Sequence, residues 1–489
     1  MPIPIFSAES IRAIDHAAIN DAGIAGYTLM TRAAEAALEA VLAKYPHTMR
    51  WQIICGGGNN GGDGYVLARL AADRGIVVSV LALSPTESLR GDAATAWQEF
   101  AAAGGIACAW EDSIDPEADL LVDALLGSGL QRDVAGRFAE VVNAINEHAA
   151  AVLAIDIPSG LNADTGAVMG VAVRANLTVT FVGLKCGLFL GDGPDCVGEL
   201  QCAELEIPPK YIAAQQAKLR RIDRSLIKSL LPPRRANAHK GDFGHVLIIG
   251  GCPGMSGAVR LCAEATLRGG AGLVSVATHP SHHAMLASGR PELMCHAIES
   301  AADLAPLVAR ATTIAVGPGL GTTEWSRSLF DAALDSGLPL VVDADALNIL
   351  SRSGLRRPDW ILTPHPGEAA RLLDCSTAEV QGDRYRALTS IGEKFGGTAV
   401  LKGSGSLVTS AAGAHWICTA GNPGMAAPGM GDVLTGIVAA MAAQGLPAEM
   451  AAVAGVYLHA RAGDTAALAG ERGLLTSDVL QELRAWVNP

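Results

Sequence analysis

A glycine-rich stretch near residue 60 is the first part of the chain that could do chemistry. Residues 55–64 read CGGGNNGGDG and follow an apolar run that is typical of a strand. Glycine tolerates positive φ and lets a ligand approach the backbone, and free N–H groups at a helix start attract phosphate. Gly56, Gly58 and Gly61 match the G-x-G-x-x-G pattern of dinucleotide-binding turns. The turn also contains amide and carboxylate side chains: Asn59, Asn60 and Asp63.

Polar side chains end two further apolar runs in the same region. VDALLGSGLQRD places Asp123 before a Gly-Ser-Gly loop, and AIDIPSG places Asp156 and Ser159 beside a proline and a glycine. Oxygen donors of this kind can hold a hard cation, and a carboxylate can act as a general acid or base. Either aspartate alone could simply cap the next helix. Three such loops in one region favour a functional site.

A second glycine-rich turn lies near the other end of the chain. Gly429-Met430-Gly431-Asp432 runs directly into the apolar segment VLTGIVAAM, which predicts a helix whose N-terminus attracts an anion. Asp432 could orient or deprotonate a hydroxyl there, as phosphoryl transfer requires; the structural alternative is a first-turn acid that only favours the helix dipole. Lys402, at a predicted strand end, could supply a cation for phosphate. His365, between two prolines at another strand end, is a further site candidate.

Alternating strands and helices must position the first group of residues. Predicted helices cover 63–74, 91–103 and 136–149. The predicted strands are continuous apolar runs without strict alternation, at 51–55, 77–83, 120–126, 151–157 and 177–183. Such runs are typical of strands buried on both faces of a parallel sheet. The fold class is therefore α/β, with a doubly wound, Rossmann-like N-terminal domain.

The second group belongs to a separate α/β domain. Segment 208–225 carries a Pro pair and lysines and arginines without a strand-like run, and we place the junction there. Further strands are then predicted at 245–251, 272–278, 313–319, 338–345, 360–365 and 398–403. Ligands bind at the carboxyl ends of strands in open α/β sheets, where most of the singled-out residues fall.

Composition restricts the class of protein. The 489 residues suffice for about two to four domains. With 50% hydrophobic and 17% charged residues the chain is no disordered protein, yet it lacks the apolar run of about 18 residues that a membrane span needs. The net charge of −13 argues against nucleic-acid partners, so any phosphate must be held by backbone N–H groups and a few cations. The ten cysteines form no CxxC pair, and no export signal is visible, so we expect a reduced, cytoplasmic protein that forms homo-oligomers.

The loops GGGNNGGDG, VDALLGSGL and AIDIPSGLNADTG resemble those of the NAD(P)H-hydrate epimerase family. The resemblance implies that residues 1–212 interconvert the R and S hydrates of NADH and NADPH, with Asp156 handling the proton. It implies potassium ligands at Asn60, Asp123 and Ser159. The implied substrate contacts are Asn59, Asn60, Gly61, Gly62, Asp63, Gly127, Ser128, Gly129, Leu130, Gln131, Arg132, Asp133 and Asp156.

The second domain, at 222–489, has a Gly-x-Gly-Asp layout that resembles the ribokinase-like fold. KGDFGHVLIIGG, GPGLG, TPHPGE and GNPGMA resemble segments of the NAD(P)H-hydrate dehydratase family. The resemblance implies ADP as co-substrate with Mg²⁺, AMP and phosphate as products, and Asp432 as the catalytic residue. Implied hydrate contacts are Ala258, Gly321, His365 and Asp432. Implied nucleotide contacts are Lys402, Gly403, Ser404, Gly405, Ser406 and Gly431. Together, the two halves resemble the family of bifunctional NAD(P)H-hydrate repair enzymes.

One loop departs from that family. Residues 425–432 read MAAPGMGD where the family usually reads MATGGTGD. Ala427 and Met430 replace threonine, and Pro428 removes a backbone N–H. The sequence therefore leaves the choice between ADP and ATP open, as it does the choice between the NADH and NADPH hydrates.

Three other functions are alternatives to hydrate repair. A ribokinase-like vitamin kinase fused to a dinucleotide-binding module would keep a phosphorylated product. A non-catalytic binding module predicts eroded loops, whereas the polar residues of the first site are all present. An ordinary NAD dehydrogenase is disfavoured because VVSVLALSP lacks the acidic residue that binds a ribose.

Overall fold

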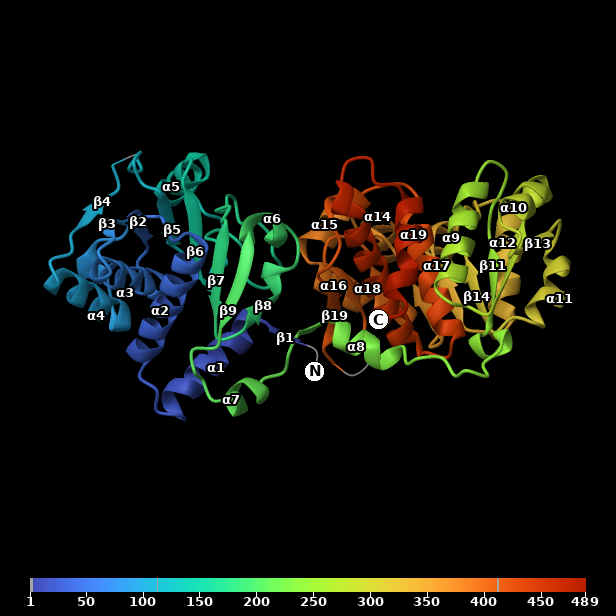
Figure 1. The fold of residues 1–489 in the computed structure, drawn as a ribbon, viewed down its shortest axis with the longest axis horizontal. Coiled ribbons are helices and arrows are strands. Elements are labelled where there is room, and N and C mark those ends of the chain that lie inside the picture. The colour runs from blue at the N-terminus through green and yellow to red at the C-terminus, as the bar shows by residue number, and fades with distance from the viewer. Residues whose placement is uncertain (1–2, 112, 411–412) are drawn as a thin grey trace. The chain divides into compact units, whose positions relative to one another are not determined.

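A computed structural model describes residues 3–111, 113–410 and 413–489. It separates into an N-terminal unit, Pro4–Leu219, and a C-terminal unit that contains Arg220–Pro489, coloured blue to green and green to red in Figure 1. The chain passes from one to the other within the short strand β10 (Leu219–Arg221).

The N-terminal unit is built on a seven-stranded parallel sheet in the order β4-β3-β2-β5-β6-β7-β9. The strands are β2 (Arg50–Cys55), β3 (Val77–Ala82), β4 (Ala107–Ala109), β5 (Leu120–Ala124), β6 (Ala151–Ile155), β7 (Leu177–Phe181) and β9 (Glu199–Ala203). Outside this sheet, β1 (Ile3–Phe6) pairs in parallel with β8 (Leu184–Lys185). The five predicted strands are thus present, each within two residues of its predicted limits.

Helices cover both faces of this sheet. They are α1 (Ala8–Asn20), α2 (Gly26–Lys44), α3 (Asn59–Asp73), α4 (Gly91–Ala102), α5 (Arg137–Glu147), α6 (Gly193–Val197) and α7 (Pro209–Ala213). Side chains alternate between faces along a strand. Ile53 of β2 accordingly packs in the core shared with α1 to α4, and Ile54 packs in the core shared with α5. This two-sided burial explains the unbroken apolar runs and confirms the doubly wound arrangement.

The C-terminal unit has its own sheet, in the order β13-β12-β11-β14-β15-β16-β17-β18-β19. It is parallel from β13 to β17 and antiparallel from β17 to β19. The strands are β11 (His245–Ile249), β12 (Leu273–Thr278), β13 (Met294–Ala297), β14 (Thr313–Val316), β15 (Leu340–Val342), β16 (Trp360–Leu362), β17 (Thr398–Leu401), β18 (Ser406–Val408) and β19 (His415–Cys418). The six predicted strands are all present.

Apolar helices pack on one face of this sheet: α9 (Ser256–Arg268), α17 (Met430–Ala443) and α18 (Ala448–Ala466). A further helix, α19 (Thr476–Trp486), packs against α18 and α9. A Cβ at Gly436 of α17 would lie 2.2 Å from the Cys262 carbonyl oxygen, so this glycine lets α17 approach α9 closely. The other helices are α8 (Arg224–Leu230), α10 (His283–Gly289), α11 (Ala305–Val308), α12 (Glu324–Asp335), α13 (Ala344–Leu350), α14 (Pro366–Leu373), α15 (Thr377–Gly382) and α16 (Arg384–Phe395).

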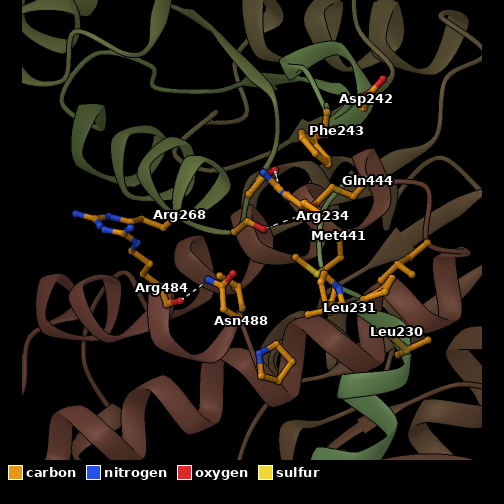
Figure 2. Close-up of a pocket in the computed structure, with 18 of the residues that line it drawn as sticks. Leu230, Leu231, Arg234, Asp242, Phe243, Arg268, Met441, Gln444, Arg484 and Asn488 are labelled. Carbon is orange, nitrogen blue, oxygen red and sulfur yellow. Dashed lines mark hydrogen bonds between the residues drawn. The ribbon is translucent and has the colours of Figure 1, made fainter. Parts of the chain in front are cut away.

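Cavities occur in both units. A cavity of about 380 Å³ follows β5 in the N-terminal unit. A larger one, about 1050 Å³, lies in the C-terminal unit at the ends of α8, α9 and α17, and Figure 2 shows residues that line it. Within the described part of the chain, no helix is both long and apolar enough to cross a membrane.

Candidate functional sites

The turn between β2 and α3 differs from the prediction in where its helix begins. Helix α3 starts at Asn59, not at residue 63, and Gly58 is the extended N-cap residue. The predicted contacts Asn59 to Asp63 therefore occupy the first turns of the helix. A Cβ at Gly61 would lie 2.1 Å from the Gly56 carbonyl oxygen, so Gly61 is required where the helix crosses the strand end. Of the three glycines that suggested a loop, Gly61 instead serves close packing inside a helix.

Asn60 is the residue of this turn that faces inward. It is 8% exposed, and its Nδ2 has no hydrogen-bond partner among the described residues. A Cβ at Gly127 would lie 3.5 Å from the Asn60 Cβ, so the loop after β5 packs against it. Neighbouring Asn59 is exposed. The fold thus brings two of the three predicted loops into contact. The buried side-chain amide of Asn60 remains able to bind a ligand.

The third loop joins them through Asp123 and Ser159, which are both fully buried. Ser159 donates from its Oγ to Asp123 Oδ1 at 2.6 Å and from its backbone N–H to Oδ2 at 2.7 Å. Ser159 Oγ also accepts from the Leu126 N–H at 2.8 Å. Burial raises the pKa of Asp123 to about 6, although the Ser159 hydrogen bonds oppose this.

Asp156 is held in an unusual conformation by a residue that the sequence did not reveal. Its φ is 67°, which is strained for a residue with a side chain. Its Oδ1 lies 2.6 Å from Nζ of Lys185, a side chain with no exposed surface. Lys185 Nζ also donates to Thr180 Oγ1 at 2.8 Å and to the Phe181 carbonyl at 3.1 Å. The signal for Lys185 was a single lysine in the apolar run FVGLKCG.

Two other carboxyl groups lie near this pair. The pKa of Asp63 is raised well above its ordinary value by burial and by the negative charges of Asp156 and Asp15. Burial also raises the pKa of Asp15 to about 6, with Lys185 acting in the opposite direction. Asp63 and Asp15 therefore hold a proton more readily than ordinary carboxyl groups do, whereas Asp156 is paired with Lys185.

The predicted segment Gly127–Asp133 lines a cavity. Five of its residues, together with Leu126, surround the space of about 380 Å³: Gly127, Gly129, Leu130, Gln131 and Arg132. Arg132 is exposed and forms no ion pair within the described ranges. Asp133, also exposed, is not among the lining residues. The cavity is therefore lined by one cation that forms no ion pair among the described residues, Arg132.

In the C-terminal unit, Asp432 lies in the first turn of α17, as predicted. The helix follows Gly429, which has φ of 87°. A Cβ at Gly431 would lie 3.1 Å from Nζ of Lys402 and 3.8 Å from Asp343 Oδ2. Burial, followed by the charge of Asp343, raises the pKa of Asp432 to about 7. A side chain with this pKa can accept a proton at neutral pH.

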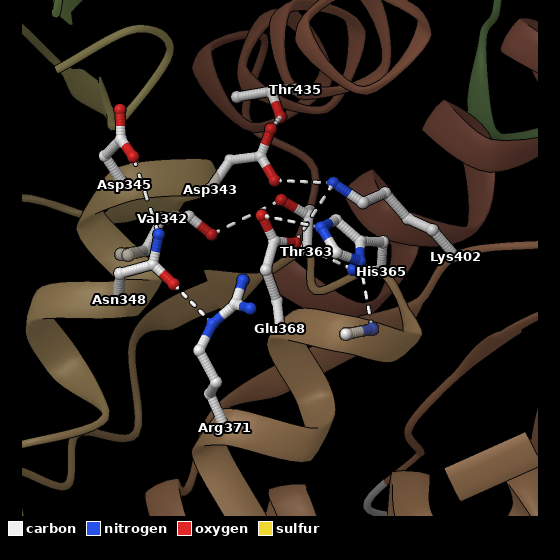
Figure 3. Close-up of polar contacts among 11 residues, drawn as sticks. Val342, Asp343, Asp345, Asn348, Thr363, His365, Glu368, Arg371, Lys402 and Thr435 are labelled. Atoms are coloured by element: carbon white, nitrogen blue, oxygen red, sulfur yellow. Dashed lines mark hydrogen bonds and ion pairs between the residues drawn. The ribbon is translucent and has the colours of Figure 1, made fainter. Parts of the chain in front are cut away.

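Lys402 is engaged by carboxylates (Figure 3). Its Nζ lies 2.7 Å from Asp343 Oδ1 and 3.7 Å from Glu368 Oε2. Thr435, on α17, donates to the other Asp343 oxygen at 2.7 Å. Burial disfavours the charge on Lys402, but these carboxylates outweigh it and raise its pKa. The sequence suggested a cation for phosphate, and the structure shows that this lysine also neutralises Asp343, which sequence reasoning missed.

His365 is the N-cap residue of α14. Its Nδ1 accepts from the Gly367 N–H at 3.0 Å, and its Nε2 lies 3.4 Å from Glu368 Oε1. Its backbone N–H donates to Glu368 Oε2 at 2.8 Å, as Figure 3 shows. Burial, assisted by Lys402, lowers the pKa of His365. The helix cap thus connects His365 to the Lys402 cluster through Glu368.

The remaining predicted hydrate contacts lie along the neighbouring loop. A Cβ at Gly319 would lie 3.2 Å from the Ala258 Cβ, so Ala258 at the start of α9 packs on the GPGLG loop. The Gly321 N–H donates to Asp345 Oδ2 at 2.8 Å. Asp345 is close enough to contribute to the raised pKa of Asp432. Ala258, Gly321 and Asp432 therefore belong to one region.

The predicted nucleotide contacts 402–406 form the turn between β17 and β18. Gly403 and Gly405 have φ of 134° and 64°. Buried Arg384 donates to the carbonyls of Leu401, Lys402 and Gly405 at 3.2 to 3.5 Å. Arg384 was not singled out from the sequence because it precedes an ordinary helical pattern. It fixes the shape of the turn.

The altered loop before α17 faces inward in part. Met430 is 7% exposed and belongs to the apolar core, and Ala427 packs against the same core. The Pro428 carbonyl accepts from Thr476 Oγ1 at 2.6 Å. Met430 therefore packs toward the protein interior.

Known proteins resemble both halves. The family model described as NAD(P)H-hydrate dehydratase matches residues 246–484, and the YjeF-related protein N-terminus model matches 26–187. The chain is 46% identical over 486 residues to the bifunctional NAD(P)H-hydrate repair enzyme Nnr of Coxiella burnetii, covering 99% of both. It is 42% identical to the Nnr enzyme of Escherichia coli, covering 100% of this chain and 95% of that one.

A solved structure resembles the C-terminal unit. A ribokinase-like superfamily protein from Enterococcus faecalis aligns with a TM-score of 0.52 and 30% identity. The alignment covers 56% of this chain and 97% of the other. It supports the ribokinase-like fold of that unit.

Proposed function

The chain belongs to the family of bifunctional NAD(P)H-hydrate repair enzymes, and we propose how its two units divide the reactions. The protein is an enzyme that restores NADH and NADPH from their hydrates through an epimerase and a dehydratase activity. We assign epimerisation to residues 1–212 and dehydration to 222–489. Each assignment rests on one observation: the Asp156–Lys185 pair in the first and Asp432 at the start of α17 in the second.

In the epimerase unit, the reacting carbon carries a hydroxyl next to the ring nitrogen. The nitrogen lone pair expels the hydroxyl, which leaves as water after taking a proton, and water returns to the opposite face and loses a proton. Asp156 moves this proton. Lys185 orients its carboxylate, and Asp63, whose pKa is raised by burial, is a second carboxyl group nearby. Asn60 and the loop Gly127–Asp133 would bind the dinucleotide.

The same unit suits a potassium ion. Asn60, Asp123 and Ser159 offer an amide, a carboxylate and a hydroxyl, which are oxygen donors that hard cations prefer. Asp123 is fully buried, and no basic side chain hydrogen-bonds to it in the described part of the chain. A bound cation would supply the missing positive charge and draw the three loops together.

In the dehydratase unit, hydroxide is a poor leaving group and phosphate is a good one. We propose that Asp432 accepts the proton of the ring hydroxyl while the hydroxyl oxygen attacks the β-phosphorus of ADP, which releases AMP. The ring nitrogen then expels phosphate, and loss of a proton from the neighbouring ring carbon restores the double bond of the dihydronicotinamide. The N–H groups at the start of α17 stabilise the charge on the moving phosphoryl group. Lys402 to Ser406 and Gly431 would bind the nucleotide, and Ala258, Gly321 and His365 the hydrate.

Magnesium would enter this unit with the nucleotide. The described residues contain no cluster of three His, Cys, Asp or Glu side chains that would hold a metal on its own. Mg²⁺ is commonly bound by one or two carboxylates together with substrate phosphates. Asp343 and Glu368, which both contact Lys402, would be these carboxylates, and the ion would neutralise phosphate charge.

Recovery of absorbance from a mixture of R and S hydrates tests the proposal. The protein is given hydrated NADH with ADP, with ATP or with neither nucleotide, and dihydronicotinamide absorbance is followed. We expect complete recovery with ADP and none without nucleotide, after correction for spontaneous epimer exchange. Recovery that stops near half would show an inactive epimerase unit. A stable phosphorylated alcohol would show a small-molecule kinase.

A further inference from the structure

Five cationic side chains line the large cavity of the C-terminal unit. They are Lys228, Arg234, Arg235, Arg268 and Arg484. The acidic side chain among the lining residues is Asp242, which pairs with His239 at 3.4 Å and caps its backbone. Even with a terminal carboxylate at Pro489 counted, cations outnumber acids. In a chain of net charge −13, this is a local concentration of positive charge.

These five cations have no carboxylate partner among the described residues. Elsewhere on the same helix the pattern is different, because Arg260 of α9 pairs with Glu264 at 2.8 Å. Arg268, at the end of α9, instead faces the cavity. In the view of Figure 2, Arg268 and Arg484 reach the same side of the pocket. Unpaired arginines that converge on a cavity are suited to an anionic ligand.

One of the arginines is already fixed in place. Arg234 donates to the Gly270 carbonyl at 2.5 Å and to Gln444 Oε1 at 2.9 Å. Its guanidinium lies 3.6 Å from the centre of the Phe243 ring. Leu230 and Leu231, which are both half-buried, add apolar surface to the lining (Figure 2). The cavity therefore offers both a cationic edge and an apolar surface.

We propose that this cavity binds a nucleotide through its polyphosphate, at a site separate from both reaction sites. Arginine pairs with phosphate in bidentate fashion, and the apolar surface suits a base. About 1050 Å³ is at the upper limit of common small-molecule sites, which is enough for a nucleotide. Met441 and Gln444 lie at the C-terminal end of α17, about 14 to 18 Å along the helix from Asp432. The ligand therefore cannot be the phosphoryl donor and would act as an effector.

Calorimetric titration of the full chain with ADP tests this site. We expect the double variant Arg268→Ser, Arg484→Ser to bind one ADP fewer per chain than the unaltered protein, with unchanged KM for ADP in dehydration. Arg260→Ser removes one charge from the same helix and should keep the full number. An equal number of bound ADP molecules in the unaltered protein and the double variant would overturn the proposal.

Two further experiments distinguish a nucleotide from free polyphosphate and from a second copy of the chain. Inorganic tripolyphosphate should compete for the additional site, and its affinity should fall as salt increases. If tripolyphosphate binds there and ADP does not, the site is for free polyphosphate and the nucleotide proposal is wrong. If the double variant changes only the oligomeric state, measured by light scattering, the cavity is a contact between copies and the proposal fails.

Discussion

Lys185 places a positive charge where no water reaches it, and three oxygen atoms surround that charge. Removing one partner of a buried pair leaves the other unpaired, at a cost of about 3–5 kcal/mol. Lys185→Met should therefore lower the free energy of unfolding by about that amount and slow epimer exchange.

The matched control for Lys185→Met is Lys44→Met. Lys44 pairs with Glu199 at 2.8 Å, but both side chains are partly exposed. Exposed pairs contribute about 0–1 kcal/mol. Urea unfolding measures the free energy of unfolding of both variants. Equal losses would show that the burial of Lys185 does not increase the cost of removing its charge.

The pH dependence of dehydration should report Asp432, whose pKa is raised to about 7. If the ionised form is the base, the rate rises tenfold per pH unit below about 7 and levels off above it. The folded state binds this proton more tightly than the unfolded chain, so the associated stability is present below about pH 3.8 and declines as pH rises toward 7.

Initial rates between pH 5 and 9 measure this dependence, with the spontaneous reaction subtracted. Asp432→Asn should give a residual rate that does not change with pH. A flat profile for the unaltered protein would assign the proton to another group.

At the scale of elements, helix α3 depends on its glycines for contact with β2. A Cβ at Gly61 would lie 2.1 Å from a backbone oxygen, which no rotamer can relieve. Gly61→Ala should destabilise the N-terminal unit by about 1–3 kcal/mol and reduce epimer exchange. Thermal unfolding and the exchange rate together measure the effect.

Gly58→Ala is the control in the same turn. Gly58 has a negative φ of −105°, and a Cβ there would meet nothing within 4 Å. Its stability should remain close to that of the unaltered protein. If Gly58→Ala and Gly61→Ala were equally stable, the close packing of α3 would not be the reason for Gly61.

Apolar patterning was sufficient to locate the long parallel strands of both sheets, but not every element. Parallel strands buried on both faces have to be apolar throughout, so the eleven predicted strands could be found from the sequence. The start of α3 could not, since glycines that permit close packing resemble glycines of a loop. Short antiparallel strands such as β18 and β19 were also missed, because three or four residues carry little pattern.

Across the whole molecule, the sequence predicted where the residues of recognisable loop motifs lie, but it did not predict which side chains they contact. Asp156 and Asp432 end or begin elements in glycine-rich segments, which marks them. Lys185, Asp343 and Arg384 act through contacts between segments distant in sequence, 29 to 59 residues for the first two. A single charged residue in an apolar run does not show which carboxylate it meets.

We propose that two independent sites in one chain perform the two reactions. The most direct measurement follows both activities on the same hydrate mixture, with R and S forms separated by chromatography and recovery followed by absorbance. Asp432→Ala should abolish ADP-dependent recovery and keep epimer exchange, and Asp156→Asn should do the reverse, slowing exchange about 10²- to 10⁴-fold. An equimolar mixture of the two variants should restore complete conversion. Loss of both activities in either folded variant would contradict the claim.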